Sequence, residues 1–371
     1  MLLTLASLLT SFFITFYSIP RIIRIAQIKQ LYDEPDERKL HKTSVPTLGG
    51  LAIFAGMIFS LTFWSTQKEI VELQYIISAT IVLFFIGMKD DLFNLVHYKK
   101  LMGQLFASYI LVHWAGIKIT SFFGLFGIHA LDPVTSYAFS IFVMVVITNS
   151  MNLIDGIDCL AASVGIVATL SFGTWFYFAG QSQYMILAGS ALGSLIAFLY
   201  YNRTPARIFM GDTGSLIIGI VLSILAIKFI EMNRVIPLGA TNKIRGIPVV
   251  TIGILIIPLF DTLRVFSIRI LQGKSPLNPD RNHLHHLLID LGFTHIKATS
   301  ALISFNLFII GLTLWMQPVR SEIVLSLMLS LCVIASYILA FIKNKKNRMV
   351  IIPLVKHKER KTTVPLPRSR S

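Results

Sequence analysis

The sequence has few charged residues and almost no cysteine. Charged side chains make up 14% of the 371 residues, hydrophobic side chains make up 54%, and the mean hydropathy is +0.72. Such a composition is typical of a membrane protein with several spans and argues against a pair of soluble domains. The two cysteines, Cys159 and Cys332, lie at or inside apolar runs. This placement excludes a disulfide framework and the paired ligand spacing of a cysteine-based zinc site.

A helix needs about 20 mostly apolar residues to cross a bilayer, and segments of this length recur along the chain. The first lacks the basic start and the cleavage site of a signal peptide, so we predict that it is retained. The predicted spans cover residues 2–19, 46–64, 70–88, 101–118, 134–153, 159–179, 183–200, 214–232, 246–266, 298–316 and 321–341. The predicted fold class is therefore all-α, a polytopic membrane protein with about eleven transmembrane helices.

Lysine and arginine are distributed unevenly between alternate loops. With the N-terminus outside, the inner loops and the C-terminal tail hold 26 of these residues, and the outer loops hold 6. The positive-inside rule therefore places the inner loops in the cytoplasm. We predict one multi-span domain over residues 1–342 and a basic cytoplasmic tail over residues 343–371. The tail is expected to be disordered and to lie on anionic headgroups.

Aspartates gather at the span ends and loops predicted to lie inside. Asp90 and Asp91 end one apolar run, Asp155 and Asp158 lie in NSMNLIDGIDCL, and Asp212 lies in FMGDTGS. Helix caps and turns would explain an ordinary loop aspartate. Two adjacent carboxylates, however, repel each other unless a cation shares them. Because Mg²⁺ takes carboxylate oxygens together with substrate phosphates, Asp90, Asp91 and Asp212 are candidate ligands.

Three histidines lie close together in the longest inner loop. His283, His285 and His286 belong to DRNHLHH, next to Arg281. A histidine cluster is compatible with zinc. The adjacent arginine and the absence of an accompanying cysteine favour phosphate binding over zinc.

Six segments together resemble a known enzyme family. They are DERKLHKTSVPTLGG (36–50), KDDLFN (89–94), KKLMGQ (99–104), NSMNLIDGIDCL (149–160), YNRTPARIFMGDTGS (201–215) and DRNHLHHLL (280–288). In this order between spans they resemble the polyprenyl-phosphate N-acetylhexosamine-1-phosphate transferases. The resemblance implies that a polyprenyl phosphate attacks a UDP-sugar, giving polyprenyl-diphosphate-sugar and UMP. It also implies a bacterial inner-membrane enzyme whose active site faces the cytoplasm.

The resemblance also implies the roles of individual residues. Asp90 would act as the base or position the lipid phosphate, Asp91 would lie near the metal, and Asp212 would bind it. The expected catalytic set is Asp90, Asp91, Asp155, Asp158, His283, His285 and His286, and the expected metal ligands are Asp91 and Asp212. The expected substrate-binding set is Lys39, Lys99, Lys100, Asn152, Asn202, Phe209 and Arg281, with Asn202 and Phe209 at the uracil.

The expected cofactor is Mg²⁺, with Mn²⁺ as an alternative. The expected partners are a UDP-N-acetylhexosamine, undecaprenyl phosphate and the lipid bilayer. No nucleic acid partner is expected, and whether the protein forms a homodimer is left open.

The form of the histidine motif bears on the sugar. His-Leu-His-His resembles the N-acetylglucosamine branch, which initiates O-antigen, enterobacterial common antigen or teichoic-acid linkage units. The runner-up is the phospho-MurNAc-pentapeptide translocase, whose branch has three consecutive histidines. A cation-coupled transporter is a more distant alternative, since it would place acids in mid-span and show related halves. Cys159 and Lys89 depart from the family pattern and bear on the identity of the sugar.

Overall fold

The computed structural model describes residues 2–31, 45–65, 72–237, 239–274 and 282–359, with the side chains of 347–359 left out. Lys39 and Arg281 lie outside these residues, so both predicted roles stay predictions. Within the described ranges the chain is helical, with one isolated β-bridge between Ser121 and Ala130. The predicted all-α class is confirmed.

The helices follow the predicted apolar segments closely. They are α1 (Leu2–Lys29), α2 (Gly49–Trp64), α3 (Leu73–Phe93), α4 (His97–His113), α5 (Pro133–Ile154), α6 (Leu160–Phe178), α7 (Ser182–Asn202), α8 (Gly211–Val235), α9 (Ile247–Ile254), α10 (Ile256–Leu271), α11 (Leu284–Asp290), α12 (His295–Trp315) and α13 (Ser321–Glu359). A short 3₁₀ turn, η1 (Leu125–Gly127), lies in the α4–α5 connection. Each predicted span coincides with one helix, except that residues 246–266 form the bent pair α9–α10.

The count of eleven spans is not confirmed. Among the described residues, seven helices are long and apolar enough to cross a membrane, or eight if the bent pair is one span. The helices outside this set are α2, α3, α4 and the seven-residue α11, and α2 and α4 have only 16 and 17 residues. These two are shorter than the roughly 20 residues that a span usually needs. The protein is nevertheless a multi-span membrane protein.

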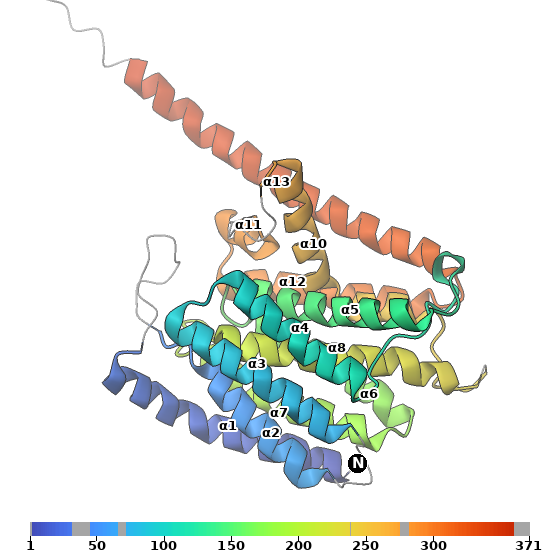
Figure 1. Ribbon diagram of the computed structural model, residues 1–371. Coiled ribbons are helices and arrows are strands. Elements are labelled where there is room, and N and C mark those ends of the chain that lie inside the picture. The colour runs from blue at the N-terminus through green and yellow to red at the C-terminus, as the bar shows by residue number, and fades with distance from the viewer. Residues whose placement is uncertain (1, 32–44, 66–71, 238, 275–281, 360–371) are drawn as a thin grey trace, which may run out of the picture.

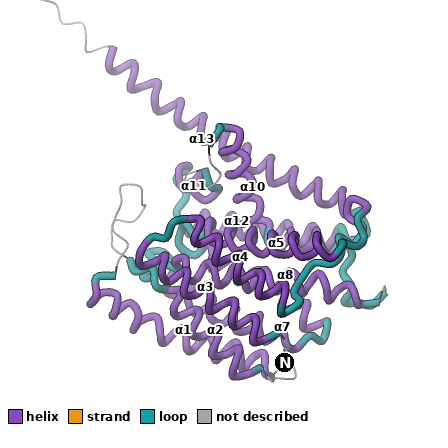
Figure 2. Tube along the Cα trace, in the orientation of Figure 1, coloured by secondary structure: helices purple, strands orange, loops and turns teal. Residues whose placement is uncertain are grey.

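Helix α8 is the centre of the bundle. Its most apolar window is 94% buried, and it packs against α2, α3, α5 and α6. Figure 1 shows α1–α5 and α8 running side by side, while α10 and the far part of α13 leave the bundle. In Figure 2, loops collect at both ends of these helices. Helix α8 is therefore shielded from lipid on most sides, and its N-terminal end meets several other chain segments.

Glycines allow α2 and α3 to approach the first turn of α8. A Cβ on Gly50 would lie 2.2 Å from the backbone N of Gly214, and one on Gly87 would lie 2.4 Å from Thr213 Cα. Gly211 adopts a φ of 68°, which an ordinary side chain disfavours. Backbone N–H groups of Gly49 and Gly50 also donate to the carbonyls of Phe209 and Met210, both at 2.9 Å. The FMGDTGS segment is thus fixed between two helix ends.

Helix α13 continues past the predicted boundary at residue 342 and ends at Glu359. The last span and the first part of the basic tail are therefore one helix. The division at 342 and the disorder of the tail stay predictions, because residues 360–371 lie outside the described part of the chain.

Candidate active site

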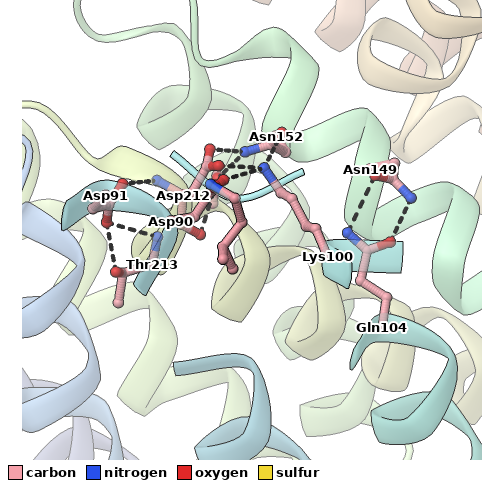
Figure 3. A network of polar contacts seen from close by, with 10 residues as sticks. Asp90, Asp91, Lys100, Gln104, Asn149, Asn152, Asp212 and Thr213 are labelled. Atoms are coloured by element: carbon pink, nitrogen blue, oxygen red, sulfur yellow. Dashed lines mark hydrogen bonds and ion pairs between the residues drawn. The ribbon is translucent and has the colours of Figure 1, made fainter. Parts of the chain in front are cut away.

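Lys100 of α4 contacts side chains from three other helices at one end of the bundle. Its ammonium donates to Asp90 Oδ2 at 3.2 Å, to Asn152 Oδ1 at 3.1 Å and to Asp212 Oδ2. Asn152 also donates to Asp212 and to Ser215 Oγ, the latter at 2.8 Å. Figure 3 shows these side chains converging from α3, α4, α5 and α8. The structure thus brings together four residues of the predicted site, with Asp90, Asn152 and Asp212 around the Lys100 ammonium.

This Lys100 cluster, comprising Asp90, Lys100, Asn152 and Asp212, is only partly shielded from solvent. The side chains of Lys100, Asp90 and Asp212 are 14%, 12% and 28% exposed. Two carboxylates that share one ammonium keep lone pairs for a cation, and the ammonium keeps affinity for an anion. The cluster can therefore bind a phosphate together with its metal ion, because the carboxylates suit the cation and the ammonium suits the anion.

Asp91 faces away from Lys100 and holds the start of α8. Its Oδ1 accepts the backbone N–H of Asp212 at 2.7 Å, and its Oδ2 accepts the N–H and hydroxyl of Thr213 at 3.0 and 2.5 Å. These N–H groups have no partner within the helix, so Asp91 acts as its cap from a neighbouring helix. The predicted metal role of Asp91 stays a prediction, and a metal there would share the carboxylate with three hydrogen bonds.

The loop between α5 and α6 connects two polar regions. Loss of water around the carboxyl group raises the pKa of Asp155 to about 8, and the charges of Asp212, Asp91 and Asp158 add to this effect. Asp158 is 1% exposed and lies 3.3 Å from His295 Nδ1. A Cβ on Gly156, between them, would lie 2.2 Å from His285 Nε2. Asp155 is therefore influenced by the charge of Asp212 in the Lys100 cluster, whereas Asp158 contacts a histidine.

The histidines form a compact group around the start of α11. The ring centroids of His283 and His285 lie 5.5 Å apart, and those of His285 and His286 lie 4.3 Å apart. Burial lowers the pKa of His285 well below its usual value, and the other histidines lower it further. His285 is therefore neutral at pH 7. The three predicted histidines are brought together as expected.

The remaining predicted substrate residues lie in different settings. Asn202 is buried, accepts the N–H of Cys159 at 2.8 Å and donates to the carbonyl of Ile208 at 2.9 Å. Phe209 is half-buried on the α7–α8 loop, and Lys99 is exposed on α4. The amide of Asn202 thus joins the Asp158 loop to the loop that carries Phe209. Their substrate roles stay predictions.

Several residues of this region were not predicted from the sequence. Asp261 on α10 pairs with His283, and His295 pairs with Asp158. Gln104 and Asn149 exchange two side-chain hydrogen bonds, at 2.6 and 3.2 Å, one turn from Lys100 and Asn152 (Figure 3). For Asp261, Gln104 and Asn149 the available signal was a polar side chain inside a predicted span, because such groups are costly in lipid unless they are paired.

The metal prediction can be compared with the donor atoms present. Within the described ranges, no group of three or more His, Cys, Asp or Glu residues is arranged to hold a metal ion. The oxygens of Asp90, Asp212 and Asn152 nevertheless match the preference of Mg²⁺, which commonly takes one or two carboxylates and completes its shell with water and phosphate. The donor set therefore fits Mg²⁺ bound together with a phosphorylated substrate, and fits zinc poorly.

The fold and the site define a class of protein. It is a multi-span helical membrane protein whose carboxylates, lysine and histidines gather where α3–α5, α8 and α10–α12 meet, an arrangement suited to phosphate chemistry. The model of glycosyl transferase family 4 matches residues 73–230. The chain is also similar to curated bacterial proteins over most of its length.

Three of these relatives illustrate the similarity. A Bacillus subtilis protein named probable undecaprenyl-phosphate N-acetylglucosaminyl 1-phosphate transferase is 31% identical over 296 residues, covering 78% of this chain and 77% of the relative. The Mycobacterium tuberculosis decaprenyl-phosphate N-acetylglucosaminephosphotransferase is 30% identical, covering 77% and 76%. The Escherichia coli K12 undecaprenyl-phosphate alpha-N-acetylglucosaminyl 1-phosphate transferase is 28% identical, covering 74% and 73%. The chain belongs to glycosyl transferase family 4, as its six motifs predicted.

Proposed function

We propose that the protein transfers N-acetylglucosamine 1-phosphate from UDP-N-acetylglucosamine to undecaprenyl phosphate. A phosphate oxygen of the lipid attacks the phosphorus atom that carries the sugar. The bond from this phosphorus to the bridging oxygen breaks, so UMP leaves and undecaprenyl-diphosphate-N-acetylglucosamine forms. The names of the relatives and the form of the histidine motif support this substrate choice over the pentapeptide translocase.

One observation carries the proposal, namely that the ammonium of Lys100 is shared by Asp90 and Asp212 at the start of α8. Phosphoryl transfer requires the protein mainly to position two anionic reactants and to offset their charge. When a phosphate arrives, the Lys100 ammonium can donate to a phosphate oxygen in place of a carboxylate oxygen. This exchange does not require the side chain to leave the cluster. Asp90 then has an oxygen free to receive the proton of a lipid phosphate or to orient it.

The metal belongs to this proposal as well. Mg²⁺ would be held by Asp212 together with phosphate oxygens, and it would supply positive charge that offsets the diphosphate. Asp91 keeps the first turn of α8 in place and so fixes the direction of the Asp212 carboxylate. Mn²⁺, which also accepts oxygen ligands, is the expected substitute.

The donor would extend from the Lys100 cluster toward the histidines. The charge of Asp212 acts on Asp155, and the next residue, Gly156, packs on His285. We assign Phe209 to stacking on the uracil and the histidine group to the sugar-phosphate side. This assignment places the nucleotide sugar along the α5–α6 loop.

We further propose that the protein resides in the bacterial inner membrane with this site facing the cytoplasm. The supporting observation is the excess of lysine and arginine in the loops on the site's side of the bundle. The proposal also fits the substrate, because nucleotide sugars are cytoplasmic metabolites.

The test uses the full-length protein in lipid nanodiscs with Mg²⁺, undecaprenyl phosphate and UDP-N-acetylglucosamine, and it follows UMP release and lipid product by mass spectrometry. Asp212→Asn should lose nearly all turnover, and added Mg²⁺ should not restore it, because the substituted side chain lacks the charge of a direct ligand. A second reaction offers UDP-N-acetylglucosamine and UDP-MurNAc-pentapeptide together. Product carrying mainly the pentapeptide would assign the protein to the translocase branch, and no UMP from either donor would refute the proposal.

A further inference from the structure

A buried carboxylate in α10 contacts the start of α11. Asp261 is 2% exposed and His283 is 5% exposed. Asp261 Oδ2 lies 2.9 Å from His283 Nδ1, and Asp261 Oδ1 accepts the backbone N–H of Leu284 at 2.8 Å. Arg264, one turn further along α10, donates to the carbonyl of Asn282 at 2.6 Å. Helix α10 thus fixes three consecutive residues, 282–284, through side chains.

The location of Asp261 makes its pairing necessary. An ionised carboxylate in an apolar helix is costly unless charges or hydrogen bonds replace its lost water. The two oxygens of Asp261 contact residues 283 and 284, and neither contacts the Lys100 cluster. Any effect of Asp261 on substrate therefore passes through the start of α11.

The pairing sets the state of the His283 ring. A carboxylate accepts a hydrogen bond, so the ring nitrogen that faces it carries the proton. Nδ1 is then the N–H nitrogen, and Nε2 is the nitrogen that is left to meet a ligand. The ring is also held from its face, since it stacks on His285 with an interplanar angle of 13°. Its position, rotation and tautomer are all fixed before substrate arrives.

We infer that Asp261 is a positioning residue that holds His283 with its proton on Nδ1 and presents Nε2 to the nucleotide-sugar donor. The ligand's identity rests on the proposed function, whereas the tautomer does not. Partners of this kind, which orient a functional imidazole without touching substrate, typically contribute 10–100-fold to activity in metal sites. We expect a loss of about this size here, expressed on the donor side of the reaction.

The kinetic test is a double-mutant cycle on the full-length protein in nanodiscs. Asp261→Asn and His283→Ala should each lower kcat/KM for UDP-N-acetylglucosamine about 10–100-fold and leave the KM for undecaprenyl phosphate unchanged. The double variant should be no worse than His283→Ala, because the inferred effect of Asp261 on the donor passes through the His283 ring. Additive losses, or an Asp261→Asn variant with wild-type kinetics, would overturn the inference.

Asp290→Asn is the matched control. Asp290 ends the same short helix, but its side chain is 45% exposed and pairs with Lys343 at 2.7 Å. Its substitution removes one carboxylate from α11 without touching His283, so wild-type kinetics are expected. A loss equal to that of Asp261→Asn would show that any disturbance of α11 has the same effect, and would count against positioning.

A spectroscopic measurement covers the case in which Asp261→Asn does not fold. With ¹⁵N-histidine labelling, the wild-type protein should give His283 signals of the Nδ1–H tautomer, assigned by their absence in His283→Ala. The Nε2–H tautomer would refute the inference, because the carboxylate would then face an unprotonated nitrogen. This readout needs no turnover, so failure of the proposed function and failure of the positioning inference are distinguishable.

Discussion

The carboxylate of Asp91 accepts the backbone N–H of Asp212 at 2.7 Å, which ties the end of α3 to the first turn of α8. The neighbouring carboxylate, Asp90, points to Lys100 instead. Two adjacent aspartates therefore have different partners. Asp91 maintains the architecture that directs Asp212, and Asp90 takes part in the charged cluster itself.

This difference predicts that substitution lowers stability at Asp91 and leaves it unchanged at Asp90. Asp91→Asn should lower the free energy of unfolding by about 1–2 kcal/mol, as loss of a helix cap does, because the amide nitrogen cannot accept from Thr213. Asp90→Asn should keep the stability, since its remaining oxygen still accepts the N–H of Leu95. Both variants should lose most activity. Thermal unfolding in detergent measures the difference, and equal melting temperatures for the two variants would contradict it.

Lys100 should be irreplaceable by its exposed neighbour. Lys100→Met removes the cation shared by Asp90, Asn152 and Asp212, and we expect kcat to fall at least about 100-fold, as when a preorganised charge-stabilising donor is lost. Lys99→Met is the matched control, because Lys99 is exposed, and a milder effect on KM is expected. Steady-state kinetics with both substrates distinguish the variants. Similar kcat values for the two would show that the cluster is not the catalytic centre.

The positions of the helices could be predicted from apolar runs, but their continuity could not. The run over 246–266 contains a bend of 81° between α9 and α10. Pro258 has no N–H to give to the carbonyl of Ile254, and Asn306 of α12 donates to the Ile254 and Gly253 carbonyls at 3.3 and 3.1 Å. A proline in a run permits such a bend without requiring it, and the compensating asparagine lies about 50 residues further along the chain.

The site could be predicted to the level of residue types and motifs, and less well to the level of partners. Asp90, Lys100, Asn152 and Asp212 do meet, because their loops emerge at one end of the bundle. The capping role of Asp91 depends on how closely glycines let α3 approach α8, which sequence spacing does not encode. Asp261 received no role because its partner His283 is 22 residues away, although an acid inside an apolar run was itself a signal.

Asp155 makes the metal-free protein sensitive to pH. Its pKa in the folded protein is about 8 against an ordinary 3.8, so the folded state binds more protons than the unfolded state between these values. The contribution of Asp155 to the free energy of unfolding is therefore fully present below about pH 4 and is lost as the pH rises through 8. Asp155→Asn, which stays neutral, should melt higher than wild type in EDTA at pH 8, with a difference that shrinks toward pH 5. A pH-independent difference would show that Asp155 does not titrate in this range.

An ion pair at the opposite end of the bundle should affect stability and not catalysis. Lys228 of α8 donates to Glu72 at 2.7 Å, and Tyr184 donates to the same carboxylate at 3.1 Å. Lys228→Met should cost about 2 kcal/mol, less than the 3–5 kcal/mol of a fully buried pair, because both partners keep some exposure. Glu72→Met with Lys228→Met should recover part of this loss, since no charge is left unpaired. Thermal unfolding tests this, and a double variant less stable than Lys228→Met would contradict it.

The orientation in the membrane can be tested with single cysteines. Cys159 and Cys332 are free and buried, so the wild-type protein should label weakly. His97 is the exposed first residue of α4, a better site than Asn94, whose φ of 48° disfavours cysteine. His97→Cys should react with an impermeant maleimide only after the cells are permeabilised, because the basic loops lie inside. Val134→Cys, exposed at the start of α5 on the other end of the bundle, should react in intact cells. Labelling of His97→Cys from outside would reverse the topology and place the Lys100 cluster away from cytoplasmic nucleotide sugars.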